Sequence, residues 1–384
     1  MTESVVNFPS QAVSDLEKMT SEYGLKVARA IQAEWFSNRD DKFTSNYDTF
    51  HKLRLYARGE QSVEKYKNEL SINGDLSYLN LDWKPVPIVS KFVDIVVNGM
   101  SQRSYEINAF SQDYASVVKR TKYMESMLKD IRSKEYNDIV LQGFDMDIYE
   151  NDKDTLPENE EELSLHMQLN YKQAIELAEE QALNVLLEES DYDLIRRRTL
   201  YDLVTIGIGA TKTNFNYSEG VKVEYVDPAN LVYSYTNSPY FEDIYYVGEV
   251  KQIPINELVK EFPNLTEQEI KEILEGPRDN TRRRYNRDYN KIEVLYFNYK
   301  THANDVYKLK QTGTGADKVI QKDDTFNPPQ DMQGEFSRLD RVIETLYEGV
   351  LILGTDKLLK WGMVPNMMRS KSDFGKVKMN YNMK

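Results

Sequence analysis

The chain has 384 residues, enough for two or three domains, and its 40% hydrophobic and 11% aromatic content excludes a wholly disordered protein. The absence of cysteine excludes disulfides, cysteine-ligated metals and thiol nucleophiles, and three widely separated histidines exclude a histidine-rich metal site. The formal charge of −14 indicates an acidic protein that does not coat nucleic acid over its whole surface. No apolar run of about 18 residues predicts a membrane span, and no secretory signal pattern precedes the first helix.

The charge is unevenly distributed along the chain. Residues 145–162 hold nine acids and one base, whereas residues 278–291 hold six bases and two acids. Residues 356–384 hold seven bases and two acids. Such runs are most often solvated surface, and the alternative is local contact with DNA.

The first half of the sequence predicts helices. A capping box from Ser14 to Glu17 precedes apolar residues at helical spacing, and Gly59 suits the left-handed position that ends a helix. Residues 60–84 are polar and are expected to be irregular, and Pro85 opens an apolar helix that is expected to end near Gly99. The longest helix is expected to break near Ser190. We predict helices over residues 14–36, 43–58, 85–100, 114–140 and about 161–205.

The second half predicts strands joined by turns. Two short helices over 254–262 and 266–274 interrupt them, and residues 276–290 and 311–336 read as loops. The last residues, after 362, are basic and show no strong period. Helices followed by strands predict an α+β fold. We predict strands over residues 210–217, 221–227, 231–235, 243–250, 291–300, 305–311, 342–354 and 357–362.

The same patterns predict four parts in chain order. The first is a mainly helical region over 1–144, and the second is an acidic loop over 145–162. The third combines the long helix with a β-rich core over 163–290. The fourth, over 291–384, is a β-rich extension with a basic C-terminal segment.

Two short motifs are weak matches to ligand-binding loops. The segment from Gly207 to Lys212 follows a helix and precedes a strand, the reverse of a phosphate-binding loop, so we interpret it as a helix end leading into a hairpin. The segment from Asp145 to Glu150 lacks the glycine that a calcium loop needs, so we interpret it as an acidic loop. The sequence predicts no metal or cofactor.

The sharpest basic cluster contains four arginines around Tyr285. Bases with an aromatic ring can hold phosphate and stack a nucleobase, which makes the cluster a candidate for contact with DNA. The alternatives are a solvated loop or ion pairs with an acidic neighbouring subunit, for which the acidic segment 145–162 is the candidate partner. The cluster consists of Arg282, Arg283, Arg284 and Arg287. No catalytic constellation stands out, so the sequence predicts no enzyme.

Four stretches, taken in order, resemble the portal proteins of tailed bacteriophages, in particular those of crAss-like gut phages. The first ends a helix with a Tyr–x–x–Gly element, and the second is a helix ending at glycine. The third is a long helix that breaks at glycine and becomes a strand. The fourth reads as a strand, Asp-Pro, an aromatic strand, a turn and a strand like YYVGEV. They are Tyr56–Gln61, Pro85–Met100, Asp191–Phe215 and Val223–Val250, within a resemblance over about residues 40–300.

The resemblance implies a ring, usually of twelve subunits, at one vertex of the capsid. It implies that the terminase motor docks on the ring, that the tail attaches to it and that double-stranded DNA passes through its channel. The implied location is the virion, with assembly in the host cytoplasm, no membrane and no cofactor. A passive conduit needs no nucleophile, and its lumen should not grip phosphate tightly.

One departure from the family concerns the C-terminal third. Portals continue into a stem helix and a clip, and no long helical pattern follows residue 300 here. We expect either a truncated chain or an elaborated wing region with the stem beyond Lys384. The alternatives in function are another phage head–tail connector component, or a nucleic-acid-binding protein or enzyme with an unrecognised site.

Overall fold

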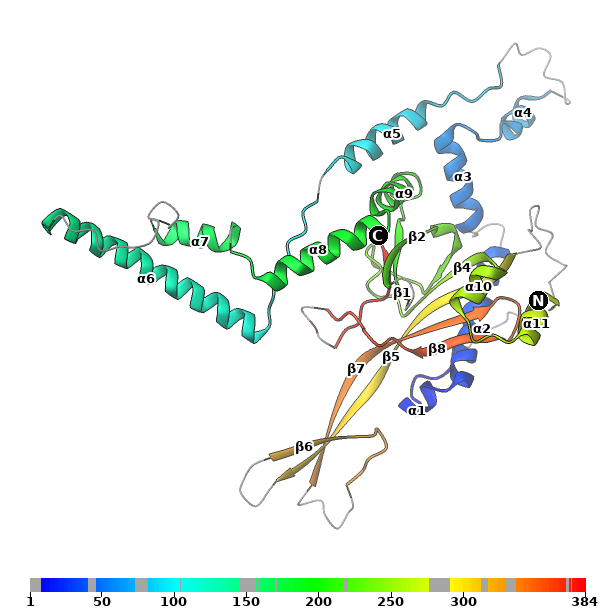
Figure 1. Cartoon of the computed structure of the whole chain (residues 1–384). Helices are drawn as coiled ribbons and strands as arrows, with labels where there is room; N and C mark the ends of the chain where they lie inside the picture. Colours follow the sequence, from blue (N-terminus) through cyan, green and yellow to red (C-terminus); the bar gives the residue numbers. More distant parts are fainter. Residues whose placement is uncertain are drawn as a thin grey trace. The chain divides into compact units, whose positions relative to one another are not determined.

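A computed structural model describes most of the chain. The described residues are 8–40, 46–72, 82–103, 105–144, 157, 159–169, 171–216, 220–275, 291–311, 317–328, 336–370, 373 and 375–384. They form helices and antiparallel sheets, which confirms the predicted α+β class (Figure 1). Two compact units result: a larger unit made of residues 1–102 and 193–384, and a helical unit made of residues 103–192.

The N-terminal helices of the larger unit begin close to the predicted positions. Ser14 accepts a hydrogen bond from the backbone of Glu17, as the capping pattern predicts, but the single helix predicted over 14–36 was wrong. The Thr20 hydroxyl accepts a bond from the backbone N–H of Tyr23 and begins a second helix there. The helices are α1 (Asp15–Lys18), α2 (Ser21–Asp40), α3 (Asn46–Arg58), α4 (Glu64–Leu70) and α5 (Ile88–Ser101).

Two predictions between residues 59 and 101 need correction. Gly59 has φ +75° and ends α3 as predicted, but helix α4 lies in the stretch that was expected to be irregular. Helix α5 continues past Gly99, where the backbone N–H of Gln102 still bonds to Asn98 and caps the last turn. Glycine inside a helix costs stability without ending it.

Three helices lie where one long helix with a break near Ser190 was predicted, over about 161–205; the break near Ser190 is confirmed, and the one before Ala174 was not predicted. They are preceded by α6, which confirms the prediction over 114–140. Helix α8 begins at a capping box in which the backbone N–H of Gln173 bonds to Glu176, and Asp191, with φ +49°, separates it from α9. These local hydrogen bonds break the periodic pattern. The helices are α6 (Tyr114–Phe144), α7 (Glu160–Leu169), α8 (Ala174–Glu189) and, leading into the larger unit, α9 (Tyr192–Thr205).

A six-stranded antiparallel sheet is the largest element of the larger unit. Its order is β3-β4-β5-β7-β8, with β6 paired to β5 near the end of the β5–β7 ribbon (Figure 1). Helices α10 (Ile255–Glu261) and α11 (Glu267–Glu275) follow β4, as predicted. The strands are β3 (Leu231–Tyr233), β4 (Tyr246–Pro254), β5 (Lys291–Gln311), β6 (Asp317–Lys322), β7 (Phe336–Ile352) and β8 (Leu358–Met363).

Strand β5 was predicted as two strands, and β6 falls in a predicted loop. Residues 301–304 between the two predicted strands are mostly polar, yet they pair in register with β7, from Thr301 opposite Thr345 to Asn304 opposite Val342. Strand β7 pairs with this stretch on one edge, and Lys18 and Asp15 bond to the backbone of His302 and Asn304, so tertiary contacts compensate for the missing strand pattern.

A second sheet brings the chain's last residues back to its middle. Its order is β2-β1-β9, from β1 (Ala210–Asn216), β2 (Gly220–Val226) and β9 (Tyr381–Met383). The β1–β2 hairpin was predicted. Strand β9 was not, because three residues are too few for a sequence pattern. Gly209 and Lys384 exchange two backbone hydrogen bonds of 2.9 and 3.1 Å, which extend the pairing.

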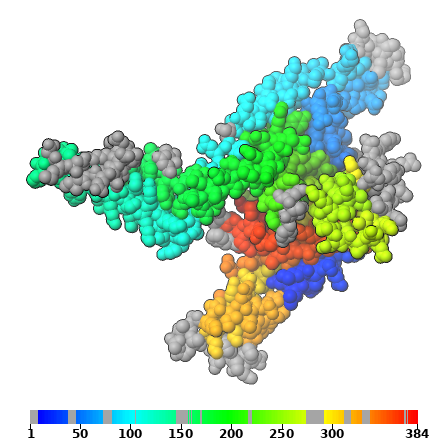
Figure 2. Space-filling view, in the orientation of Figure 1, coloured from blue at the N-terminus to red at the C-terminus, as the bar shows by residue number. Residues whose placement is uncertain are grey.

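The main core lies between α2 and the six-stranded sheet. Val27 and Ile31 on α2 are fully buried against Leu295 and Leu351 of the sheet. The Lys18 ammonium donates to the backbone carbonyl of His302, and the Trp361 indole donates to the carbonyl of Lys18, which anchors the start of the helix. The dark-blue N-terminal residues accordingly lie beside the orange and red C-terminal part of the chain in Figure 2.

The compact units do not follow the four parts predicted in chain order. Because α2 packs on strands near the C-terminus, residues 1–102 and 193–384 form one unit. Residues 103–192 form the other, with α6 and α8 joined by a buried carboxylate. Glu176 accepts hydrogen bonds from the backbone of Ser111 and from Arg120, at 2.9 and 2.5 Å.

The packing of Phe297 against Gly349 gives a test of the core. A Cβ at Gly349 would lie 2.3 Å from the Phe297 ring, which is buried and stacks near Trp361. We predict that Gly349→Ala destabilises the protein by about 1–3 kcal/mol, since overpacking forces the ring to move. Urea denaturation followed by tryptophan fluorescence measures this.

The matched control is Gly362→Ala in the neighbouring strand β8. A Cβ there meets nothing within 4 Å. The control should change stability by less than about 0.5 kcal/mol or raise it slightly. Equal effects of the two variants would contradict the packing described.

Candidate functional site

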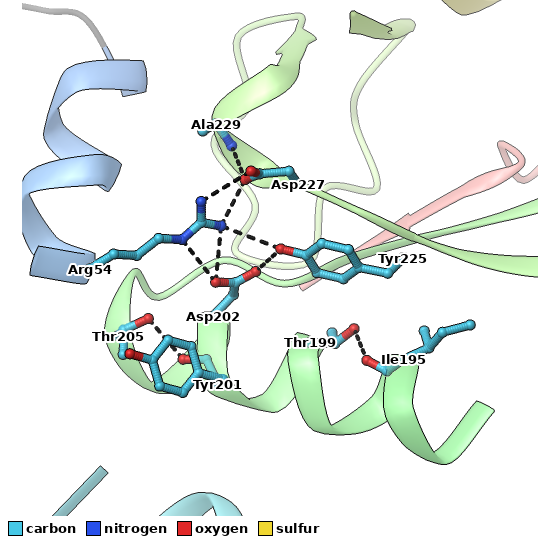
Figure 3. Close-up of polar contacts among 9 residues, drawn as sticks. All are labelled: Arg54, Ile195, Thr199, Tyr201, Asp202, Thr205, Tyr225, Asp227 and Ala229. Atoms are coloured by element: carbon cyan, nitrogen blue, oxygen red, sulfur yellow. Dashed lines mark hydrogen bonds and ion pairs between the residues drawn. The ribbon is translucent and has the colours of Figure 1, made fainter. Parts of the chain in front are cut away.

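Arg54 on α3 is the centre of a hydrogen-bonded cluster (Figure 3). Its Nη2 lies 2.7 Å from a carboxylate oxygen of Asp227 and 3.0 Å from one of Asp202, and its Nη1 donates to Asp227 at 3.0 Å. The Tyr225 hydroxyl donates to the other oxygen of Asp202 and accepts a bond of 3.3 Å from Arg54. Carboxylates thus occupy two N–H edges of the planar guanidinium group.

Each partner of Arg54 comes from a different local structure. Asp202 lies in the last turns of α9 and is 3% exposed. Tyr225 is the next-to-last residue of β2, and Asp227 follows the strand. The Asp227 carboxylate also accepts the backbone N–H of Ala229 at 3.0 Å and so caps the 3₁₀ turn Pro228–Asn230. The cluster therefore joins α3 to α9 and to the end of a strand.

Burial sets the protonation equilibria of this cluster. Burial raises the pKa of Asp202, against the lowering effects of the Tyr225 hydroxyl and of Arg54. For Arg54, burial acts to lower the pKa, but the hydrogen bond and charge of Asp227 and the charge of Asp202 outweigh it and raise the pKa. Burial and then Asp202 raise the pKa of Tyr225. Arg54 stays charged, and it compensates a carboxylate that burial would otherwise protonate.

A cavity of about 410 Å³ opens beside this cluster. Three helices line it: Arg54 and Arg58 come from α3, and Asp94 and Val97 come from α5. From α9 come residues that lie three or four positions after one another, at 194, 197, 198 and 201, which places them on one face of the helix. They are Leu194, Arg197, Arg198 and Tyr201, joined by Asp202 and by Tyr225 of β2.

Three of the four arginines at the cavity are available for an anion. Within the described part of the chain, Arg58 and Arg197 make no ion pair. The Arg198 guanidinium lies 5.9 Å from the centre of the Tyr225 ring, a distance typical of cation–π contact. By contrast, the N–H groups of Arg54 are already bonded to Asp202 and Asp227. The site can bind a negatively charged group, and its arrangement offers no nucleophile paired with a base.

The four stretches that carry the family resemblance meet at this site. Arg58 belongs to the first stretch, and Asp94 belongs to the second. Asp202 belongs to the third, and Asp227 belongs to the fourth. Segments separated by up to about 170 residues thus contribute to one cluster, since Arg54 and Asp227 are 173 residues apart.

The segment from Gly207 to Lys212 forms a helix end and a strand, as interpreted from the sequence. Gly207 has φ +89° and ends α9. A Cβ on Gly209 would lie 2.7 Å from Thr199, so this glycine permits close packing of the strand on the helix. Lys212 is buried, and its ammonium lies 4.6 and 5.0 Å from the ring centres of Tyr296 and Tyr381. The motif is therefore part of the core.

A second cluster of buried charges surrounds Lys212. Burial lowers the pKa of Lys212 and raises the pKa of Glu249. Lys251 bonds to Glu224 at 2.7 Å and lies 3.8 Å from Glu249, and the Tyr296 hydroxyl donates to Glu261. These side chains come from both sheets. Lys212 and Glu249 are buried, and the cluster forms a polar contact between the sheets.

The basic cluster predicted from the sequence, Arg282, Arg283, Arg284 and Arg287, lies outside the described residues. Its proposed acidic partner, 145–162, lies mostly outside them as well. The sequence analysis did not identify Arg54, Asp202, Tyr225 and Asp227. The available signal was the Arg196–Arg198 run three residues before a helical Tyr-Asp pair, but adjacent helical residues point about 100° apart, so the run alone does not define a site.

The described residues lack two kinds of feature. They contain no group of three or more histidine, aspartate or glutamate side chains that could hold a metal ion. No helix among them is long and apolar enough to cross a bilayer. Comparison of the sequence with protein-family models finds no match, and comparison with curated proteins finds none either.

The Arg54 cluster predicts a large effect of removing the guanidinium. Arg54→Met leaves Asp202 buried without its countercharge, and we expect a loss of about 3 kcal/mol in the free energy of unfolding at pH 7. The pH dependence has a definite sign. Burial already raises the pKa of Asp202, and losing Arg54 raises it further, so the folded variant binds more protons than the unfolded chain. The deficit relative to the wild type should shrink as pH falls from 8 to 5.

Arg29→Met is the matched control, because Arg29 pairs with Asp356 at 2.8 Å on the surface, with both side chains more than half exposed. It should cost less than about 0.5 kcal/mol at any pH in this range. Urea denaturation at several pH values measures both variants. A deficit for Arg54→Met that is small, or that grows as pH falls, would contradict the assignment.

Proposed function

We propose that the chain is a subunit of a tailed-bacteriophage portal, a ring that conducts double-stranded DNA at one vertex of the capsid. Its partners are other copies of itself, the capsid, the terminase and the tail or an adaptor. The protein has no catalytic activity of its own and belongs to the virion. The observation that carries this proposal is that residues of all four portal-like stretches meet at the Arg54 cluster and the cavity beside it.

The convergence supports the proposal because it relates weak motifs to one another. Each stretch alone is a short pattern that many folds could contain. Arg54 lies two residues before the Tyr–x–x–Gly element, and it binds the acids of the helix-to-strand stretch and of the Asp-Pro stretch. A shared structural role gives a physical reason for these elements to occur in one chain in this order.

Helix α5 supports assembly into a larger particle. Its inner face packs with Val93 and Val97 buried, but Phe92 and Ile95 are 64% and 67% exposed. Among its 14 residues only Lys91 and Asp94 are charged. Helices that are apolar on nearly all sides are normally buried, and a contiguous exposed apolar surface marks a protein interface. In a ring, the neighbouring copies supply such an interface.

The test of the proposal is the mass of the purified protein and its double variant Phe92→Ser/Ile95→Ser. We expect the wild type to form particles of about twelve subunits in mass photometry, with a central hole in electron micrographs. The double variant should shift to monomers, because the substitutions remove the apolar area that drives association.

Lys91→Ser, on the same exposed helix, is the control and should leave the rings intact. Circular dichroism should show the same helix content for all three proteins. A wild type that stays monomeric at micromolar concentration would overturn the assembly proposal. Rings that bind neither a terminase nor a capsid would favour another head–tail component.

A further inference from the structure

We propose that the arginine-lined cavity of the larger unit is a binding site for a phosphate group of a nucleic-acid backbone. Its cationic wall is built from two helices, with Arg58 on α3 and Arg197 and Arg198 on α9. Within the described residues, none of these three arginines has a carboxylate partner. The inference rests on this arrangement and does not depend on ring formation.

The neighbouring acids do not cancel this positive charge. Asp202 is engaged by Arg54 and Tyr225, and Asp227 is engaged by Arg54 and by the backbone of Ala229. That leaves Asp94 as the other carboxylate lining the cavity, against three arginines. The Arg54 cluster, with one arginine and two acids, carries one negative charge, so the four arginines and three acids of the site leave one net positive charge.

A phosphate group fits this wall. The guanidinium group is a planar fork whose paired N–H groups match two oxygens of a phosphate, and arginines on facing helices can bind it from two sides. The cavity volume of about 410 Å³ exceeds what a bare phosphate needs and leaves room for an attached sugar. Val97 and Leu194 give an apolar surface for such a group.

The net charge of the chain restricts where DNA can bind. A chain of net charge −14 repels DNA over most of its surface, so binding has to occur where positive charge is concentrated. One phosphate held by a few arginines gives a weak affinity that falls as the salt concentration rises. Such a contact can hold a strand locally without stopping its movement.

The experiment measures binding of a fluorescein-labelled 16-base-pair DNA duplex to the full chain by anisotropy, from low to moderate salt. In a separate measurement, thermal unfolding with added inorganic phosphate tests whether free phosphate is the ligand. The variants are Arg197→Gln/Arg198→Gln on one wall and Arg58→Gln on the other. Arg29→Gln, which changes an exposed arginine at the surface pair with Asp356, is the control.

We expect the affinity for the duplex to fall roughly tenfold for each arginine removed, with the control unchanged. The slope of log affinity against log salt should fall by about one in the double variant, because the site neutralises one phosphate. Stabilisation by inorganic phosphate that is lost in the double variant, without duplex binding, would keep the site and identify free phosphate as its ligand.

Two results would overturn the inference. One is duplex affinity and salt slope that are the same in the double variant, in Arg58→Gln and in the wild type. The other is a wild-type protein that responds neither to the duplex nor to inorganic phosphate. Circular dichroism of each variant separates loss of binding from loss of folding.

Discussion

The ion pairs of Arg54 are the interaction on which the larger unit's arrangement depends. A buried carboxylate is costly unless it is paired, so Asp202 requires a cation at that point of the fold. Arg54 meets this requirement and also binds Asp227. The Asp227 carboxylate in turn accepts the backbone N–H of Ala229. Helix α3 is thereby held to α9 and to the end of β2, and the cavity between the helices keeps its shape. Within the described residues, the three other arginines at the cavity have no carboxylate partner and can bind a ligand.

The same principle appears at two further joins. Lys212 lies between the rings of Tyr296 and Tyr381 where the two sheets meet, with Glu249 buried nearby. In the helical unit, Glu176 receives two backbone N–H groups and Arg120. In each case apolar packing supplies most of the driving force, and a buried polar group determines which partner is accepted, since a mismatched partner would leave a charge unpaired. Stability and specificity thus come from different residues.

The sequence predicts elements well where the pattern is local and poorly where pairing with a distant segment determines the structure. The fold class, α5, α6, the β1–β2 hairpin and the short helices α10 and α11 follow from periodicity, caps and turns. Strand β9 and the polar centre of β5 do not, because their partners lie far along the chain. The cluster around Arg54 was missed for the same reason: Arg54 and its two acids are 148 and 173 residues apart. The basic run 282–287 was predicted as a site because its residues are adjacent, and adjacency can be seen in the sequence alone.

The central claim is that the Arg54 cluster fixes a subunit whose apolar helix α5 is covered by neighbouring copies in a ring. A cryo-electron microscopy map of the purified full chain at pH 7, at a resolution that shows side chains, tests it most directly. The account predicts a closed ring in which Arg54 lies between Asp202 and Asp227 in every copy and Phe92 is buried at a subunit boundary. A monomer with Phe92 facing solvent, or a ring in which Arg54 contacts neither acid, would contradict it.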